Sequence, residues 1–157
     1  MPGVDETTFD SFASATGIDI DPAKGFVLGR LAFELKNSLV GVVDDPVGCA
    51  TVEVVDGVDD PAAFSEANIR YKNLNGDFKP LTKQDQTNQG NGAFLVANLT
   101  ADVTLKAFVG EAPIGEAQAI AKPGAVTYVP VYTYTEETAP DGVAPVTVNP
   151  QPKPCTK

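Results

Sequence analysis

Short alternating runs of strand-forming residues, separated by glycine, proline, asparagine and aspartate, constrain the fold of this chain more than any other feature. No comparable helical pattern lies between the runs. Six of them are predicted as strands: residues 26–33 (FVLGRLAF), 50–55 (ATVEVV), 68–74 (NIRYKNL), 93–97 (AFLVA), 103–109 (VTLKAFV) and 126–134 (VTYVPVYTY). Such a series is typical of an all-β sandwich, and we predict an immunoglobulin-like antiparallel β-sandwich of about seven strands.

The 157 residues divide into three parts around this series of strands. We expect the sandwich over 25–135, preceded by an N-terminal extension with a short helix over 1–24. The last part, 136–157, is rich in proline, which favours an extended tail. A disulfide, the tail's own domain or an adjacent subunit would each hold such a tail in place.

The helix is predicted over residues 5–17, where Phe9 and Phe12 recur at helical spacing and Gly17 provides a stop. The two phenylalanines need cover, either from the sandwich of the same chain or from a neighbouring subunit. A second, single helical turn is predicted after Asp60, with Asp60 as the N-cap and Pro61 as the first helical residue.

The last predicted strand differs from the others because it places aromatic residues on one face. Tyr128, Pro130, Tyr132 and Tyr134 share that face by alternation, and Pro130 cannot donate to a ladder, so we expect an edge strand. The tyrosines are candidate contact residues for a partner, although tyrosine on a strand also arises from β-propensity and rim packing. In the other strands alternation leaves polar residues, Arg70 among them, facing solvent.

Two cysteines, Cys49 and Cys155, have no metal-ligand or redox-motif spacing. A disulfide between them would join the tail to the sandwich, with a stabilisation of about 4–5 kcal/mol in the chain-entropy model. Such a bond would imply an oxidising compartment, whereas two unpaired thiols would fit a reducing one.

Charge excludes some partners. The formal net charge is −10, with 21 acidic against 11 basic residues, so nucleic acid and anionic membranes are disfavoured as partners. No apolar stretch approaches the ~20 residues of a transmembrane span. Residues 1–9 (MPGVDETTF) lack the basic and apolar regions of an export signal. Either a signal has been removed, or the protein is not exported by that route.

The chain contains no histidine, which excludes Ser-His-Asp and Cys-His nucleophiles and imidazole metal sites. Acidic pairs remain, such as Asp19 with Asp21 and Asp59 with Asp60, but they lie beside glycine or proline where aspartate favours turns. We therefore expect no enzyme and no cofactor. Calcium stays open as an alternative, because the stretch 73–77 (NLNGD) is similar to part of a calcium loop.

Several segments together carry a resemblance to a known family. They are 18–25 (IDIDPAKG), 27–30 (VLGR), 48–52 (GCATV), 92–94 (GAF), 98–99 (NL) and 103–105 (VTL). Over about 18–134 the chain resembles a carboxypeptidase regulatory-like, prealbumin-like β-sandwich, a domain common in secreted and cell-surface bacterial proteins. The resemblance implies a non-catalytic module for surface attachment, assembly or interdomain contact. The matching positions are structural, so they carry over no binding residues.

Two functions follow as expectations. The first is an extracellular or cell-surface structural or interaction protein, in its repeating form a self-assembling subunit of a filament or layer. Its contact candidates are Phe9, Phe12 and the tyrosine-bearing strand, and its partner is another protein or a second copy. We expect deletion of residues 1–17 or 138–157 to abolish assembly without unfolding the core. The alternative is a small-ligand or carbohydrate binding module, which predicts stabilisation by the ligand.

Overall fold

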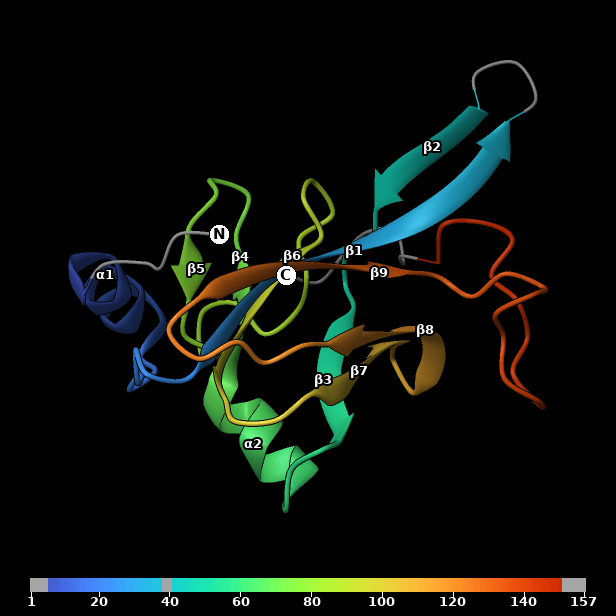
Figure 1. Ribbon diagram of the computed structural model, residues 1–157. Helices are drawn as coiled ribbons and strands as arrows, with labels where there is room; N and C mark the ends of the chain where they lie inside the picture. The colour runs from blue at the N-terminus through green and yellow to red at the C-terminus, as the bar shows by residue number, and fades with distance from the viewer. Residues whose placement is uncertain (1–5, 38–40, 151–157) are drawn as a thin grey trace.

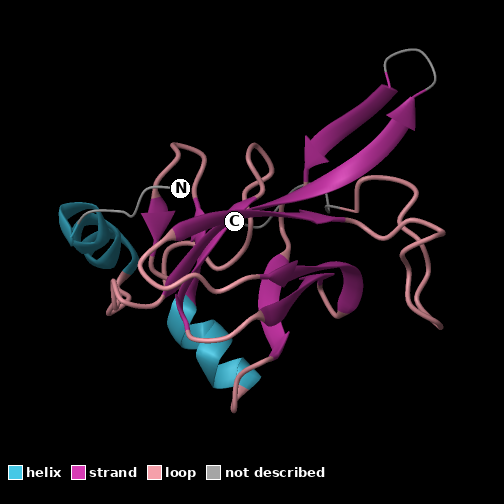
Figure 2. Cartoon of the chain, viewed as in Figure 1, coloured by secondary structure: helices cyan, strands magenta, loops and turns pink. Residues whose placement is uncertain are grey.

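Two β-sheets and two short helices make up the fold (Figures 1 and 2). The structure, a computed structural model, describes residues 6–37 and 41–150, with the backbone alone for 6–9, 34–37 and 41–44. The helices are α1 (Glu6–Thr16) and α2 (Pro61–Asn68). The strands are β1 (Gly25–Asn37), β2 (Gly41–Pro46), β3 (Thr51–Asp56), β4 (Ile69–Lys72), β5 (Phe78–Lys79), β6 (Ala93–Leu99), β7 (Val103–Val109), β8 (Ala112–Ala119) and β9 (Val126–Tyr132). The all-β prediction is confirmed.

The larger sheet has the order β2-β1-β6-β4-β5, and β9 pairs with the other side of β1. The smaller sheet has the order β3-β7-β8. Neighbours pair antiparallel except for β1 and β9, which run parallel from Phe26 opposite Val126 to Ala32 opposite Tyr132. The predicted antiparallel sandwich of about seven strands differs from this arrangement in two details. The described residues form nine strands, and the last strand returns parallel to the first.

The main core lies between the two sheets and is built from buried aliphatic and aromatic residues of both. Within it Gly29 and Phe94 pack closely, and the two residues are paired across β1 and β6. A Cβ at residue 29 would lie 2.1 Å from the Phe94 ring, so only glycine leaves room for this ring. Glycine at residue 29 therefore fixes how the ring packs in the core.

A second, smaller core covers part of the outer face of the larger sheet. Its buried members are Ile18, Phe26, Phe78, Leu95 and Ala97. Helix α1 lies over them, and the Phe12 ring is 5.2 Å from that of Phe26 and 6.1 Å from that of Phe78. The larger sheet is therefore buried on both faces beneath α1.

Arg70 lies buried next to this helix, not in solvent as strand alternation predicts. Its guanidinium donates to the carbonyl oxygens of Thr16 (3.1 Å), Glu66 (2.7 Å) and Ile69 (2.7 Å). Burial lowers the pKa of Arg70. The prediction fails because α1 ends over this position and supplies an orphan helix-terminal carbonyl that a buried guanidinium can bind.

The free edge of β3 is capped by three hydroxyl groups from other elements. The N–H groups of Ala50, Val52 and Val54 donate to Thr87 Oγ1 (3.1 Å), Tyr71 Oη (2.9 Å) and Ser65 Oγ (2.9 Å) respectively. Each hydroxyl also donates to a carbonyl, of Val47, Val52 and Pro61 in the same order. An edge capped in this way has no free N–H for another strand along this stretch.

Strands β1 and β2 continue beyond the rest of the larger sheet as a two-stranded ribbon (Figure 1). We call this ribbon the arm and define it as residues 33–37 of β1 with 41–45 of β2. Its pairs run from Phe33 opposite Asp45 to Asn37 opposite Gly41. Strand β9 leaves β1 at Ala32, so on its other side the arm has no partner among the described strands.

Candidate interaction surface

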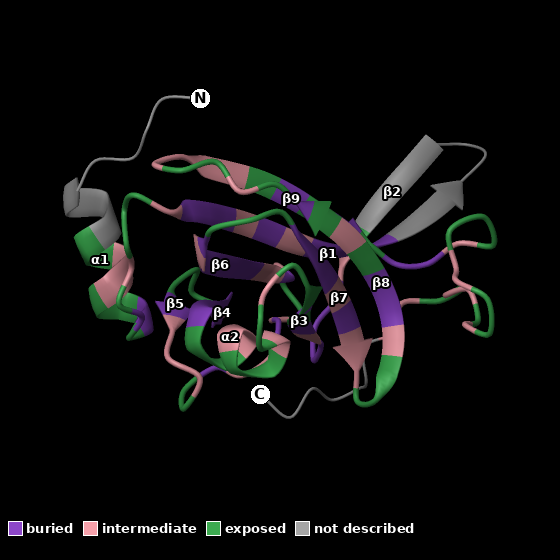
Figure 3. Ribbon diagram, turned by 60° about the horizontal axis from the view of Figure 1, so that its bottom comes forward, coloured by how far each residue is buried: buried purple, intermediate pink, exposed green. Residues whose placement is uncertain are grey.

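An aromatic patch lies on the outer face of the larger sheet, on β9 and the strand beside it. We call it the β9 face and define it as Leu28, Arg30, Tyr128, Pro130 and Tyr132. Parallel pairing places Leu28 opposite Tyr128 and Arg30 opposite Pro130, so these residues share one face. Tyr128 is 61% exposed and Tyr132 is 40% exposed, whereas Val129 and Val131 between them are buried. Figure 3 shows this alternation along β9.

Arg30 is the cation of the β9 face, and the side chain is partly exposed. Among the described residues, ion pairs join Lys24 with Asp21 and Lys79 with Asp77, and none involves Arg30. Tyrosine and arginine are the residue types most enriched at the energetic centres of protein interfaces. In a chain with net charge −10, an arginine between two tyrosines favours a partner that brings a carboxylate.

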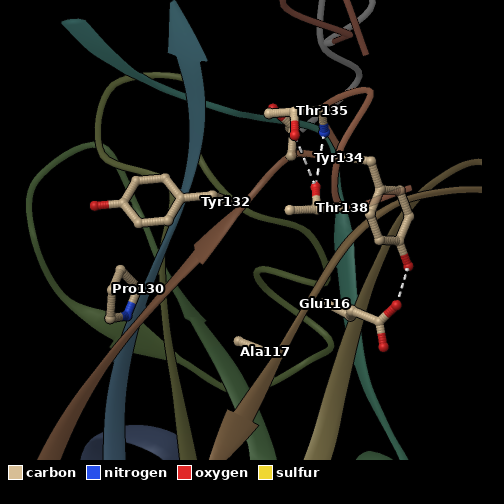
Figure 4. A pocket seen from close by; sticks show the side chains of 8 residues that line it. Glu116, Ala117, Pro130, Tyr132, Tyr134, Thr135 and Thr138 are labelled. Carbon is tan, nitrogen blue, oxygen red and sulfur yellow. Dashed lines mark hydrogen bonds between the residues drawn. The ribbon is translucent and has the colours of Figure 1, made fainter. Parts of the chain in front are cut away.

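Tyr134 is not part of this face, and the prediction that it shares the face of Tyr132 is wrong. It is 2% exposed, and its hydroxyl donates to Glu116 Oε1 over 3.1 Å. Figure 4 shows Tyr132 and Tyr134 on opposite sides of the strand. Alternation fails there because β9 ends at Tyr132, after which Tyr134 N–H donates to Ile114 O (2.8 Å) in β8. Burial and the bond to Glu116 raise the pKa of Tyr134 to about 12.

A pocket of about 380 Å³ opens between β8 and the end of β9 (Figure 4). Its lining residues are Glu116, Ala117, Pro130, Tyr132, Thr133, Tyr134, Thr135 and Thr138. Its polar groups are mainly hydroxyls, and Glu116 is the one carboxylate in the lining. A pocket of this size and chemistry fits a small polar ligand next to the β9 face.

Phe12 contacts its own chain, as described above for the core under α1. The expectation that the sandwich of the same chain covers this residue is therefore confirmed. Phe9 lies in α1, but its side chain is outside the described residues. Phe12 is partly buried by these contacts.

Cys49 is buried next to β3, with a φ of 58° in the left-handed region. It is not a free thiol. Cys155 lies outside the described residues, so the pairing of these two residues stays a prediction. The described part of the tail does contact the rest of the fold, because Val146 N–H donates to Tyr134 O (2.8 Å) and Asn149 Nδ2 donates to Pro46 O (3.2 Å).

Two of the aspartates considered as candidate acids or ligands bind nearby backbone N–H groups. Asp60 caps α2 through Ala63 N–H (3.1 Å), and Asp21 Oδ1 accepts from Ala23 N–H (2.9 Å). In the stretch resembling a calcium loop, Asn73 Oδ1 accepts from Asp77 N–H (3.0 Å) and so caps the turn between β4 and β5. Among the described residues, no group of three or more His, Cys, Asp and Glu residues could hold a metal ion.

Comparisons with protein-family models, curated proteins and solved structures find no match to this chain. Within the described residues, no helix is both long and apolar enough to span a membrane.

Two members of the β9 face, Leu28 and Arg30, are absent from the candidates that the sequence yields. Alternation in the run 26–33 already places them on one face of the first strand. What local sequence does not reveal is that this strand lies beside β9, some 100 residues later, because strand pairing over that distance depends on the whole fold.

Proposed function

We propose that this protein is a non-catalytic structural or interaction protein, extracellular or at the cell surface, that binds a protein partner through the β9 face. The observation that supports the proposal is the pair of exposed tyrosines, Tyr128 and Tyr132, with Arg30 between them on one sheet face. In the repeating form of the proposal the partner is another copy, and the protein is a subunit of a filament or layer. We also propose that the fold is of the immunoglobulin-like or prealbumin-like type and that Cys49 forms a disulfide with Cys155.

The physical reason is that rigid aromatic side chains bury a large area at low entropic cost. Tyr128 and Tyr132 are held on a paired strand whose inward residues, Val129 and Val131, are fixed in the core. A partner would therefore bind a surface that is already in place. An isolated exposed residue such as Leu74, which is 73% exposed in a loop, offers no such platform.

The test compares the full-length protein with a double variant, Tyr128→Ser with Tyr132→Ser, and with Leu74→Ser as the matched control. Light scattering after size exclusion gives the particle mass. In the repeating form, the wild type and the control form particles heavier than two copies, and the double variant does not. A wild type of no more than two copies would contradict self-assembly through this face. A different protein partner is then sought by photo-crosslinking from position 128, with position 74 as the control.

The pocket beside Tyr132 favours a second candidate function, a small-ligand or carbohydrate binding module. Sugars stack on exposed aromatic rings, and the threonine hydroxyls of the lining can bond to theirs. A panel of oligosaccharides would then raise the thermal midpoint of the wild type. The rise would be lost in Tyr132→Ala and kept in Leu74→Ser.

A further inference from the structure

The arm has an open backbone edge where β9 has ended. Leu31 N–H donates to Gly92 O (2.8 Å) and Leu31 O accepts from Val47 N–H (3.1 Å), so the peptide groups of Leu31 point toward β6 and β2. Ala32 O accepts from Thr133 N–H (3.1 Å), on the opposite side. Because peptide groups alternate between the two edges of a strand, those of residues 34 and 36 point to the side on which no described strand continues.

The other described edges of the two sheets are closed to a further strand. Three hydroxyls cap β3, and β5 has two residues. Strand β9 has Pro130, which lacks an N–H, in its middle. The edge of β8 faces β9 and is bonded at both ends, through Ile114 O to Tyr134 N–H (2.8 Å) and through Ile120 O to the Thr127 hydroxyl (3.5 Å). Among the described strands, the arm is the stretch of edge that is not closed in any of these ways.

The sequence of the arm matches itself in one antiparallel register. In a pairing of two copies centred on Leu35, Glu34 of one copy lies opposite Lys36 of the other, and Lys36 lies opposite Glu34. Both of these residues belong to the set whose peptide groups point to the open edge, so the two copies would exchange four backbone hydrogen bonds. Shifting the centre to residue 34 or 36 would place Glu34 opposite Glu34 or Lys36 opposite Lys36.

We propose that the arm is a dimerisation element and that its occupant is the arm of a second copy, joined edge to edge about a two-fold axis centred on Leu35. The product is a continuous four-stranded sheet, in the order β2-β1 of one copy and then β1-β2 of the second copy. A two-stranded ribbon is marginal in water, and four strands are not. Self-pairing of an identical strand is the form that a two-fold interface takes.

The outer edge of β2 is a poorer candidate for the same role. Its sequence carries Asp44 and Asp45 side by side, and at its base Asn149 already donates to Pro46 O. Like charges opposite one another across two strands are destabilising. Beyond Ala32, the β1 edge pairs with no described strand on this side, and its sequence carries the matching charges. The outer edge of β2 has two adjacent aspartates and a bond to Asn149 at its base.

The experiment uses charge reversal in the full-length protein, with sedimentation velocity over a concentration series. Every protein in this experiment also carries Tyr128→Ser and Tyr132→Ser, so that assembly through the β9 face adds no mass. The chain with the unchanged arm, called the wild type here, is expected to move from 16.4 kDa toward twice that mass as concentration rises. Lys36→Glu places Glu opposite Glu twice, and Glu34→Lys places Lys opposite Lys twice. We expect each single variant to raise the dimer dissociation constant about ten-fold or more.

The decisive measurement is the mixture. An equal mixture of Lys36→Glu and Glu34→Lys restores opposite charges at both positions, so dimers should form between the variants although neither variant forms them alone. The double variant, Glu34→Lys with Lys36→Glu, should dimerise like the wild type. Glu111→Lys and Lys122→Glu, the same charge changes at exposed positions elsewhere, should leave dimerisation unchanged. Recovery in the mixture also shows that both variants are folded.

A wild type that stays monomeric up to its solubility limit would overturn the proposal. So would a dimer that survives both single variants, or a mixture that fails to dimerise when the wild type does. This inference rests on the proposed function in one point, since both take a second copy of the chain as a binding partner. The two can be told apart, because Tyr128→Ser with Tyr132→Ser should leave this dimer intact even if the β9 face binds nothing.

Discussion

The hydroxyl cap on β3 makes a quantitative prediction for Tyr71→Phe. The Tyr71 hydroxyl accepts from Val52 N–H over 2.9 Å and donates to Val52 O over 3.3 Å, and both residues are buried. Phenylalanine keeps the ring and removes the hydroxyl, leaving two backbone groups without a partner. A buried group left in this state costs about 1–3 kcal/mol. With two such groups, we expect the free energy of unfolding at neutral pH to fall by about 2–6 kcal/mol in total.

The same hydroxyl predicts how this loss depends on pH. Burial, partly opposed by the bond to Val52, raises the pKa of Tyr71 from 10.0 to about 12 in the folded protein. The unfolded chain therefore loses the phenol proton first as the pH rises. The stability supplied by the neutral phenol is complete below pH 10 and is lost between pH 10 and about 12. The difference between wild type and variant should shrink by up to about 3 kcal/mol over that window.

Urea unfolding followed by circular dichroism, repeated from pH 7 to pH 11, measures both effects. Tyr128→Phe is the control, since it removes a hydroxyl from a side chain that is 61% exposed, and it should change stability by less than about 0.5 kcal/mol. The reasoning is refuted if Tyr71→Phe unfolds like the wild type at neutral pH. It is also refuted if the difference stays constant as the pH rises through 10.

Three further predictions concern single positions. Gly29→Ala must displace the buried Phe94 ring, so we expect a loss of at least about 1–3 kcal/mol in a urea titration, recovered in part by adding Phe94→Leu. Asp60→Ala removes the N-cap of α2 and should cost about 1 kcal/mol, whereas Asp60→Ser should cost little. Peptide mapping without reductant should find Cys49 linked to Cys155, and two separate thiol peptides would contradict that pairing.

Strands whose pattern is set by burial on one face were predictable from the sequence. The run 103–109 coincides with β7, and 93–97 lies within β6. Strand β8 was missed because Pro113 and Gly115 interrupt its alternation. Gly115 is there for a tertiary reason, since a Cβ would lie 2.5 Å from Tyr132 O where the two sheets meet. The residue that hides the strand from pattern analysis is the one that allows the sheets to approach.

The candidate surface was predictable only in part. Local alternation correctly gives Tyr128, Pro130 and Tyr132 one exposed face, because a strand with buried valines between them can have no other arrangement. The same alternation wrongly places Tyr134 on this exposed face, because nothing in the local sequence indicates that the strand ends at Tyr132 and that the chain then turns toward β8. The partner strand, its parallel direction and the neighbouring Arg30 all depend on contacts between segments far apart in the chain.

Helix α1 and the described part of the tail contact the rest of the fold, and this changes how assembly can be tested. The expectation was that deleting residues 1–17 or 138–157 would spare the core. Phe12 packs on Phe26 and Phe78, and Arg70 binds the last carbonyl of α1, so removing 1–17 would expose apolar rings and leave a buried guanidinium short of an acceptor. Loss of assembly in a truncated chain would then reflect loss of folding as much as loss of contact. Point variants on the β9 face and the arm leave these contacts in place, so they are the informative test.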